Sequence, residues 1–288
     1  RGAGAYAIAC QTVIYALCRM IMLWCYSTWR PSLTFKRQSF NELFSFSSKL
    51  LLTNILNTCA CRLFPSVIGK CYNKIDAGLY ENGQRWGNMP QDFGAGTIAN
   101  VTFPAISAVN RDDSERMRRV CRKMVRVTSF IVFPLFIGIM VCCSRSAISY
   151  IIKPEWADVV PYILFVSCAG IFNGLNTANY NVLKTKGLSS AILKFEIIRN
   201  LLTILSIVVC IPFGIRCMLC AMVAVSVINY ILFTIKVNRL LGVTLLEHIK
   251  DVLPYGTIMV IAAVAALLLT SVVGALNPIL VILLQFVV

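Results

Sequence analysis

Long apolar runs separated by short polar segments extend along the chain, and this pattern predicts a helical membrane protein. A helix needs about 20 mainly apolar residues to cross a bilayer. Such runs fill eight windows: 3–29, 45–69, 78–108, 121–152, 157–183, 188–211, 215–240 and 255–275. A ninth run, NPILVILLQFVV, has 12 residues. We therefore expect an all-α polytopic membrane protein with eight transmembrane helices and a truncated ninth, in a chain cut at both ends.

Basic residues in the connecting loops predict the orientation of these helices. The loops after the first, third, fifth and seventh windows hold most of the loop Lys and Arg. Because Lys and Arg are retained on the cytoplasmic side, the chain should begin outside and alternate across the membrane. The segment SERMRRVCRKMVR, 114–126, follows the third window. We expect it to be a juxtamembrane helix that touches anionic lipid headgroups. The alternative, nucleic-acid binding, is disfavoured because no aromatic residues are interleaved.

The composition excludes a soluble globular domain. The chain is 58% hydrophobic and 14% charged, and its mean hydropathy is +0.76. These values lie far from the balance found in soluble domains. The 27 basic residues outnumber the 12 acidic ones, which gives a net charge of +15. In a membrane protein such an excess favours positively charged cytoplasmic loops and a cavity that handles anions.

Cysteine and histidine do not predict a metal site or another cofactor. The 13 Cys are scattered, and the only adjacent pair, Cys142 and Cys143, lies in an apolar run. We interpret the Cys as small apolar side chains and the single histidine, His248, as a surface residue without a partner. No HExxH, GxSxG or phosphate-binding loop motif occurs, and the predicted loops are too short for a globular active site. The sequence therefore does not predict an enzyme.

Polar residues inside the predicted spans form stripes. An ionisable residue at the bilayer centre costs at least about 2.5 kcal/mol, so it needs a partner, a hydrated cavity or a role. The second window has a stripe that recurs every four residues: Asn54, Thr58, Arg62 and Ser66. The fifth window has another at helical spacing: Asn173, Asn176, Thr177, Tyr180 and Lys184. Each stripe lies on one helical face.

Further charged residues lie in the third and sixth windows. Glu196 precedes Arg199 and Asn200 by three and four residues, so its carboxylate can pair with either. Arg85 and Asp92 lie in the third window, the latter in MPQDFGAG. A hydrated, net-positive cavity between helices accounts for the stripes and the charges together. Hydrogen bonds between neighbouring helices remain the simpler explanation for any single Asn or Thr.

Several short motifs, taken in order, resemble a known family. They are GLY at 78–80, VTFPAIS at 101–107, FPLFIG at 133–138, EW at 155–156, NVLKTKG at 181–187, KFEIIRN at 194–200 and IPFGI at 211–215. Together they resemble the C-terminal two-thirds of a bacterial polysaccharide or O-antigen flippase. Such flippases form the Wzx-type branch of the multidrug/oligosaccharidyl-lipid/polysaccharide exporter superfamily.

The resemblance implies two six-helix lobes with a central cavity that opens alternately to each side. In this chain it implies four parts. Residues 1–30 would be the last helix of the N-lobe, 31–44 a cytoplasmic linker, and 45–241 a six-helix C-lobe. Residues 242–288 would be an amphipathic segment and additional, truncated C-terminal helices. The first five helices of the family pattern are lacking.

The resemblance also implies transport of undecaprenyl-diphosphate-linked oligosaccharide across the bacterial cytoplasmic membrane. The expected partners are this substrate, membrane lipids and the polysaccharide biosynthesis machinery. The substrate-binding candidates in the cavity are Lys49, Asn57, Arg62, Arg85, Asn173, Asn176, Tyr180 and Arg199. Arg62, Arg199 and Lys49 would attract the diphosphate, and the Asn and Tyr side chains would contact sugar hydroxyls. Asp92 and Glu196 are candidates for binding a coupling cation.

Two other functions stay open at this point. A cation-coupled multidrug exporter of the same superfamily would favour an acidic cavity, whereas the cavity candidates here are mostly basic. A membrane-embedded glycan polymerase would need a large outer loop with catalytic groups, and the longest predicted outer connection, 153–157, is far shorter than that.

Overall fold

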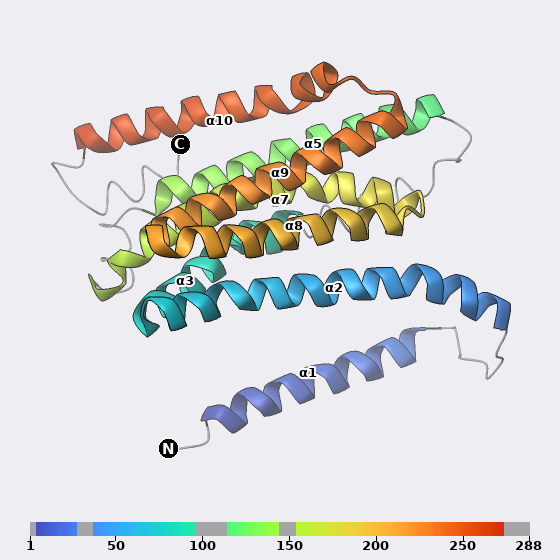
Figure 1. Ribbon diagram of the computed structural model, residues 1–288, viewed down its shortest axis with the longest axis horizontal. Helices are drawn as coiled ribbons and strands as arrows, with labels where there is room; N and C mark the ends of the chain where they lie inside the picture. The colour runs from blue at the N-terminus through green and yellow to red at the C-terminus, as the bar shows by residue number, and fades with distance from the viewer. Residues whose placement is uncertain (1–3, 28–36, 96–113, 144–153, 274–288) are drawn as a thin grey trace. The chain divides into compact units, whose positions relative to one another are not determined.

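The structure is a computed structural model that describes residues 4–27, 37–95, 114–143 and 154–273, and every regular element in these ranges is helical (Figure 1). The longer helices are α1 (Gly4–Tyr26), α2 (Arg37–Cys71), α3 (Lys74–Gly87), α5 (Ser114–Cys142), α7 (Val160–Thr185), α8 (Ser189–Cys210), α9 (Ile215–Leu241) and α10 (Leu245–Val273). Three short ones are a π-helix, η1 (Gln91–Ala95), and two 3₁₀ helices, η2 (Pro154–Val159) and η3 (Ile211–Phe213). The chain divides into two compact units, residues 1–44 and 45–288.

Six helical segments in the described ranges are long and apolar enough to cross a membrane, which confirms a multi-pass, all-helical membrane protein. They are 47–71, 115–142, 156–185, 189–213, 215–241 and 245–268. The first predicted span corresponds to α1, a helix of 23 residues, of which the stretch Cys10–Tyr26 is described in full and is apolar. The predicted ninth run at 277–288 lies outside the described residues. The described part therefore contains six such spans, and the expected count of eight stays a prediction because the first and third windows extend beyond the described residues.

The third predicted window, 78–108, does not form one continuous α-helix where it is described. Helix α3 ends at Gly87 after 14 residues, and the π-helix begins at Gln91. Pro90 lies between them and has no backbone N–H to donate to a regular helical turn. A π-turn widens the helix locally. The rest of this window lies outside the described residues.

Helix α7 packs against α3, α5 and α9 in the second unit. Two Gly-x-x-x-Gly pairs allow the close approach. Gly83 and Gly87 of α3 face α7, where a Cβ on Gly83 would lie 2.5 Å from the Cβ of Tyr162. Gly170 and Gly174 of α7 face α5, where an added Cβ would likewise come too close to a side chain of the neighbouring helix. Small residues at such positions let two helices in a membrane pack closely.

Side-chain contacts show the relative directions of four helices in the second unit. Lys49 contacts Ser190 between α2 and α8, and Tyr72 contacts Ile211 just beyond the C-terminal ends of these two helices. Arg118 contacts Glu247 and Arg126 contacts Asp251 between α5 and α10. In each pair of helices the residue numbers rise together, so the two helices are parallel. Parallel pairs agree with the predicted alternation, in which the second and sixth spans, and the fourth and eighth, cross in the same direction.

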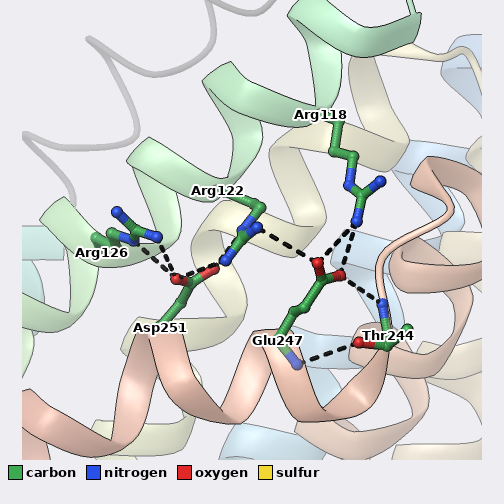
Figure 2. Close-up of polar contacts among 6 residues, drawn as sticks. All are labelled: Arg118, Arg122, Arg126, Thr244, Glu247 and Asp251. Carbon is green, nitrogen blue, oxygen red and sulfur yellow. Dashed lines mark hydrogen bonds and ion pairs between the residues drawn. The ribbon is translucent and has the colours of Figure 1, made fainter.

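Three arginines of α5 meet two carboxylates of α10, as Figure 2 shows. Arg118 donates to both carboxylate oxygens of Glu247, at 2.9 and 2.7 Å. Arg122 and Arg126 each reach a carboxylate oxygen of Asp251 at 2.6 Å. The side chain of Asp251 is only 4% exposed. We call these five residues the arginine–carboxylate ladder, and it ties the beginnings of α5 and α10 together.

The ladder adds a role for residues 114–126 that the sequence analysis did not predict, and it leaves their predicted contact with lipid headgroups untested. Three of the basic side chains in that segment pair with carboxylates of α10, so only the other basic side chains are left for a contact with lipid headgroups. Arg119 and Lys123 are exposed. No local sequence pattern predicts this pairing, because the paired residues lie 125 to 129 positions apart.

The beginning of α10 corrects the prediction for His248. Thr244 and Glu247 form a capping box: the Thr244 N–H donates to the Glu247 carboxylate at 3.0 Å, and the Glu247 N–H donates to the Thr244 hydroxyl at 3.2 Å. The helix that starts here turns His248 towards α9. There its Nε2 lies 2.8 Å from the hydroxyl oxygen of Tyr230, and the residue is 8% exposed. His248 is therefore buried and partnered.

Candidate functional site

A polar cleft in the second unit lies among α2, α7, α8, α9 and the segment that contains the π-helix. Its volume is about 450 Å³. The residues that line it are Asn54, Asn57, Asn88, Gln91, Asp92, Asn173, Asn176, Thr177, Tyr180, Glu196, Arg199 and Asn229. All of them have polar side chains, although four of the contributing helices include apolar membrane spans. Such a concentration of polar groups suits a hydrated ligand site and not a contact with lipid.

Arg199 of α8 lies at the centre of the contacts in this polar cleft. Its guanidinium is 2.9 Å from a carboxylate oxygen of Glu196, one turn earlier on the same helix. It also donates to the side-chain oxygen of Asn57 on α2 at 2.5 Å. The Glu196 side chain is 5% exposed, whereas that of Arg199 is 24% exposed. Arg199 therefore joins α2 to α8 and keeps part of its guanidinium open to the cleft.

A second, smaller cleft of about 200 Å³ shares Asn88, Asn173 and Arg199 with the polar cleft. Its other polar residues include Asn200 and Ser226, and the remaining wall is partly apolar. Arg199 thus borders both spaces. A ligand with an anionic group and a larger polar part could contact this arginine from either side.

Several buried amide atoms around the two clefts have no hydrogen-bond partner among the described residues. In the polar cleft these are the side-chain oxygens of Gln91, Asn176 and Asn229. In the smaller cleft both the oxygen and the nitrogen of Asn200 are unpaired. An unpaired buried polar group costs about 1–3 kcal/mol. A ligand rich in hydroxyl groups could offer both donors and acceptors to such atoms.

The structure brings together seven of the ten predicted site residues in the polar cleft: Asn57, Asp92, Asn173, Asn176, Tyr180, Glu196 and Arg199. Lys49 instead donates to the hydroxyl of Ser190 at 3.0 Å. Arg62 and Arg85 are exposed and line neither cleft.

The charge of the polar cleft differs from the predicted net-positive cavity. Its charged lining among the described residues consists of Asp92, Glu196 and Arg199. Two carboxylates therefore accompany one guanidinium, and that guanidinium is already paired. The predicted excess of positive charge is not supplied by the described lining.

The sequence reasoning missed several residues that line the two clefts. Asn229 and Ser226 lie three positions apart on α9, in a stretch that is otherwise apolar. Their helical spacing is the same kind of signal as the polar stripes of the second and fifth windows. Asn88 and Gln91 carry no such signal, because the window 78–108 predicts a regular helix and the structure has a π-helix at Gln91–Ala95.

Two other features are less suited to binding a polar ligand. A larger cavity of about 640 Å³ lies among α5, α9 and α10, and its lining is mainly apolar, with Phe133, Ile231 and Val252 among its members. Cys217 and Cys220 form a Cys-x-x-Cys pair in α9 that the interpretation of the cysteines passed over. In the part of the chain that the structure describes, no group of three or more His, Cys, Asp or Glu side chains could hold a metal ion.

Comparison with known proteins gives one family and several relatives. A family model described as "Polysaccharide biosynthesis protein" matches residues 1–161. The teichuronic acid biosynthesis protein TuaB of Bacillus subtilis is 25% identical over 159 residues, which cover 55% of this chain and 32% of TuaB. The lipopolysaccharide biosynthesis protein WzxC of Escherichia coli is 24% identical over 181 residues, 63% of this chain and 36% of WzxC.

A third relative is the succinoglycan biosynthesis transport protein ExoT of Rhizobium meliloti. It is 24% identical over 177 residues, 61% of this chain and 35% of ExoT. The chain therefore spans about a third of the length of the curated relatives that it matches. No solved structure gives a significant match.

Proposed function

The chain belongs to the polysaccharide biosynthesis protein family, and on that premise we propose that it acts as a flippase for lipid-linked oligosaccharide in the bacterial cytoplasmic membrane. The proposed substrate is an oligosaccharide on undecaprenyl diphosphate. A relative named as a transport protein and two named for polysaccharide biosynthesis support this reading. A transporter needs a binding cavity and does not need catalytic residues, so the proposed function is non-enzymatic.

The observation that carries the proposal is the polar cleft with its unpaired buried amides. A sugar presents hydroxyl groups that both donate and accept hydrogen bonds, and Asn side chains do the same. Asn173, Asn176 and Asn229 would contact these hydroxyls. Arg199 would contact the diphosphate, since a guanidinium makes charge-assisted and often bidentate bonds with phosphate oxygens. The lipid tail would remain in the bilayer beside the helices.

For the transport cycle, we propose the two-lobe arrangement of the family, with residues 45–241 as one lobe and residues 1–30 as the last helix of the other. Residues 31–44 would link the lobes, and the helices of 242–288 would be additions to them. Alternating access would then move the two lobes relative to each other around the binding site. The polar cleft would form one wall of the central cavity.

Substitution of Arg199 tests the proposal directly. We expect Arg199→Ala, introduced into the full chain, to lower transport of the lipid-linked substrate roughly 10- to 100-fold, because a hydrogen bond to a charged group is worth about 1.5–3 kcal/mol. Surface polysaccharide would be measured in a host whose own transporter gene has been deleted. Arg216→Ala is the matched control, since Arg216 is an exposed arginine at the start of α9, outside both clefts. If both variants restore surface polysaccharide equally well at equal protein levels, the assignment of the cleft is wrong.

The charge of the polar cleft supports a second candidate, a cation-coupled multidrug exporter. Asp92 and Glu196 give the described lining more acidic than basic groups, and such a site would attract organic cations. A dye-efflux assay separates the two functions. Export of cationic dyes without any effect on surface polysaccharide would favour the exporter.

A further inference from the structure

Arg199 is already engaged by an internal anion before any ligand arrives. The Glu196 carboxylate lies 2.9 Å from its guanidinium, and the Asn57 side-chain oxygen lies 2.5 Å away. Glu196 is nearly enclosed, with 5% of its side chain exposed, so water cannot readily take the place of its partner. The proposed phosphate site is thus occupied by a group from the protein itself.

A carboxylate and a phosphate compete for an arginine on similar terms. Both present oxygen acceptors that match the planar fork of the guanidinium. The guanidinium has five N–H donors and no acceptor, so it can exchange one anion for another or share its donors between two. Two anions held at the same guanidinium also repel each other in a space of low dielectric constant. A phosphate that binds Arg199 must therefore displace Glu196 at least in part.

On these grounds we propose that Glu196 is a built-in competitor of the substrate phosphate for Arg199. The inference rests on the proposed function, because it assigns a role to a second residue of the same site. Displacing Glu196 offsets part of the gain from the phosphate contact, so the substrate binds less tightly and leaves faster. Glu196 is then a specificity and release residue: it admits a ligand whose anion competes well for arginine, and it restores the arginine pair once that anion departs.

The surroundings provide a place for each anion during the exchange. On the side of the smaller cleft, Asn200 neighbours Arg199 in sequence and has an unpaired, buried side-chain nitrogen. This N–H donor would bind a phosphate oxygen beside the guanidinium. On the other side, Asn57 accepts a hydrogen bond from Arg199 and lies close enough to the Glu196 carboxylate to interact with it. Asn57 can therefore hold the carboxylate when the arginine turns to the phosphate.

Binding of an isoprenoid diphosphate tests the competition. The probe is farnesyl diphosphate, with farnesol as its uncharged counterpart, added to the purified full chain in detergent micelles. We expect Glu196→Gln to tighten farnesyl diphosphate binding by about tenfold, equivalent to about 1.4 kcal/mol, mainly through slower dissociation. Binding of farnesol should not change. In an Arg199→Ala background, Glu196→Gln should have no effect on binding, because the two anions then have nothing to compete for.

Asp92→Asn is the matched control for a general change of charge. It removes one carboxylate from the same polar cleft, yet Asp92 is exposed and no ion pair joins it to Arg199 in the described structure. If Asp92→Asn tightens binding as much as Glu196→Gln does, the effect is simple charge neutralisation and the inference fails. Weaker or unchanged binding by Glu196→Gln would also overturn it, because Glu196 would then merely orient the arginine.

A shorter acidic side chain at position 196 provides a second test in case Glu196→Gln does not fold. Glu196→Asp keeps the charge but shortens the reach to Arg199 by one methylene group, so we expect a smaller tightening in the same direction. Weaker binding by this folded variant would contradict the competition. The proposed function fails separately, if Arg199→Ala alone leaves farnesyl diphosphate binding unchanged.

Discussion

Replacing Gly170 by Ala tests how closely α7 and α5 must approach. An added Cβ would overlap the ring of Phe136, lying 2.8 Å from Cζ and 3.0 Å from Cδ1 and closer still to Cε1. Phe136 is completely buried, so its ring has no free space into which to move. Overpacking of this kind costs about 1–3 kcal/mol, and the upper end applies to a rigid, enclosed ring. The better helix propensity of Ala offsets about 1 kcal/mol, which leaves a net loss of about 2 kcal/mol.

Gly138→Ala on α5 is the matched control, because an added Cβ there would meet nothing within 4 Å. It should be neutral or stabilise the protein by up to about 1 kcal/mol. Gly174→Ala should fall between the two, since its Cβ would lie 3.0 and 3.1 Å from the methyl groups of Val132. One kcal/mol shifts the melting midpoint of a domain of this size by about 2–4 °C. We therefore expect Gly170→Ala to lower the midpoint by about 4–8 °C.

The assay is thermal unfolding of the full chain in detergent, followed by tryptophan fluorescence. Equal midpoints for Gly170→Ala and Gly138→Ala would refute the reasoning. They would show that α5 and α7 are not in close contact at Gly170, or that Phe136 can move.

Two further predictions concern contacts outside the clefts. Asp251→Asn should lower the free energy of unfolding by about 2 kcal/mol, because it weakens charge-assisted bonds to two arginines that are themselves partly exposed and can rehydrate. Thermal unfolding would measure this, with the exposed Glu115→Gln of α5 as a control that should change little. Tyr72→Phe removes the 2.6 Å hydrogen bond from the Tyr72 hydroxyl to the carbonyl of Ile211 and should cost about 1 kcal/mol. Faster amide hydrogen exchange around residues 211–214 would report it, and unchanged exchange there would show that the bond contributes little.

The sequence predicted the membrane helices well wherever one apolar run was bounded by turn residues. The windows 188–211 and 215–240 correspond to α8 and α9, which cover 189–210 and 215–241. Gly214, with a φ of 93°, separates them and explains the clear boundary. The prediction for 78–108 was less successful, because Pro90 and the π-helix interrupt the single helix that this window predicted.

The local part of the candidate site was also predictable, and its long-range part was not. Helical spacing placed Asn173, Asn176 and Tyr180 on one face, and the three-residue spacing of Glu196 and Arg199 anticipated their ion pair. Asn57 contacts Arg199 across 142 positions of the chain, and no local periodicity encodes such a contact. The same limit applies to the charge of the cleft, since exposed arginines and cleft-lining ones look alike in sequence.

The arginine–carboxylate ladder has a consequence for how the chain is made. Arg118 and Glu247 are 129 positions apart. At synthesis rates of about 5–20 residues per second, Arg118 leaves the ribosome roughly 6–26 s before its carboxylate partner. During that interval the arginines of α5 are charged groups at the membrane surface, free to anchor the helix to anionic lipid headgroups. The arrival of α10 then exchanges this temporary anchor for a permanent one, so the same side chains serve insertion first and folding afterwards.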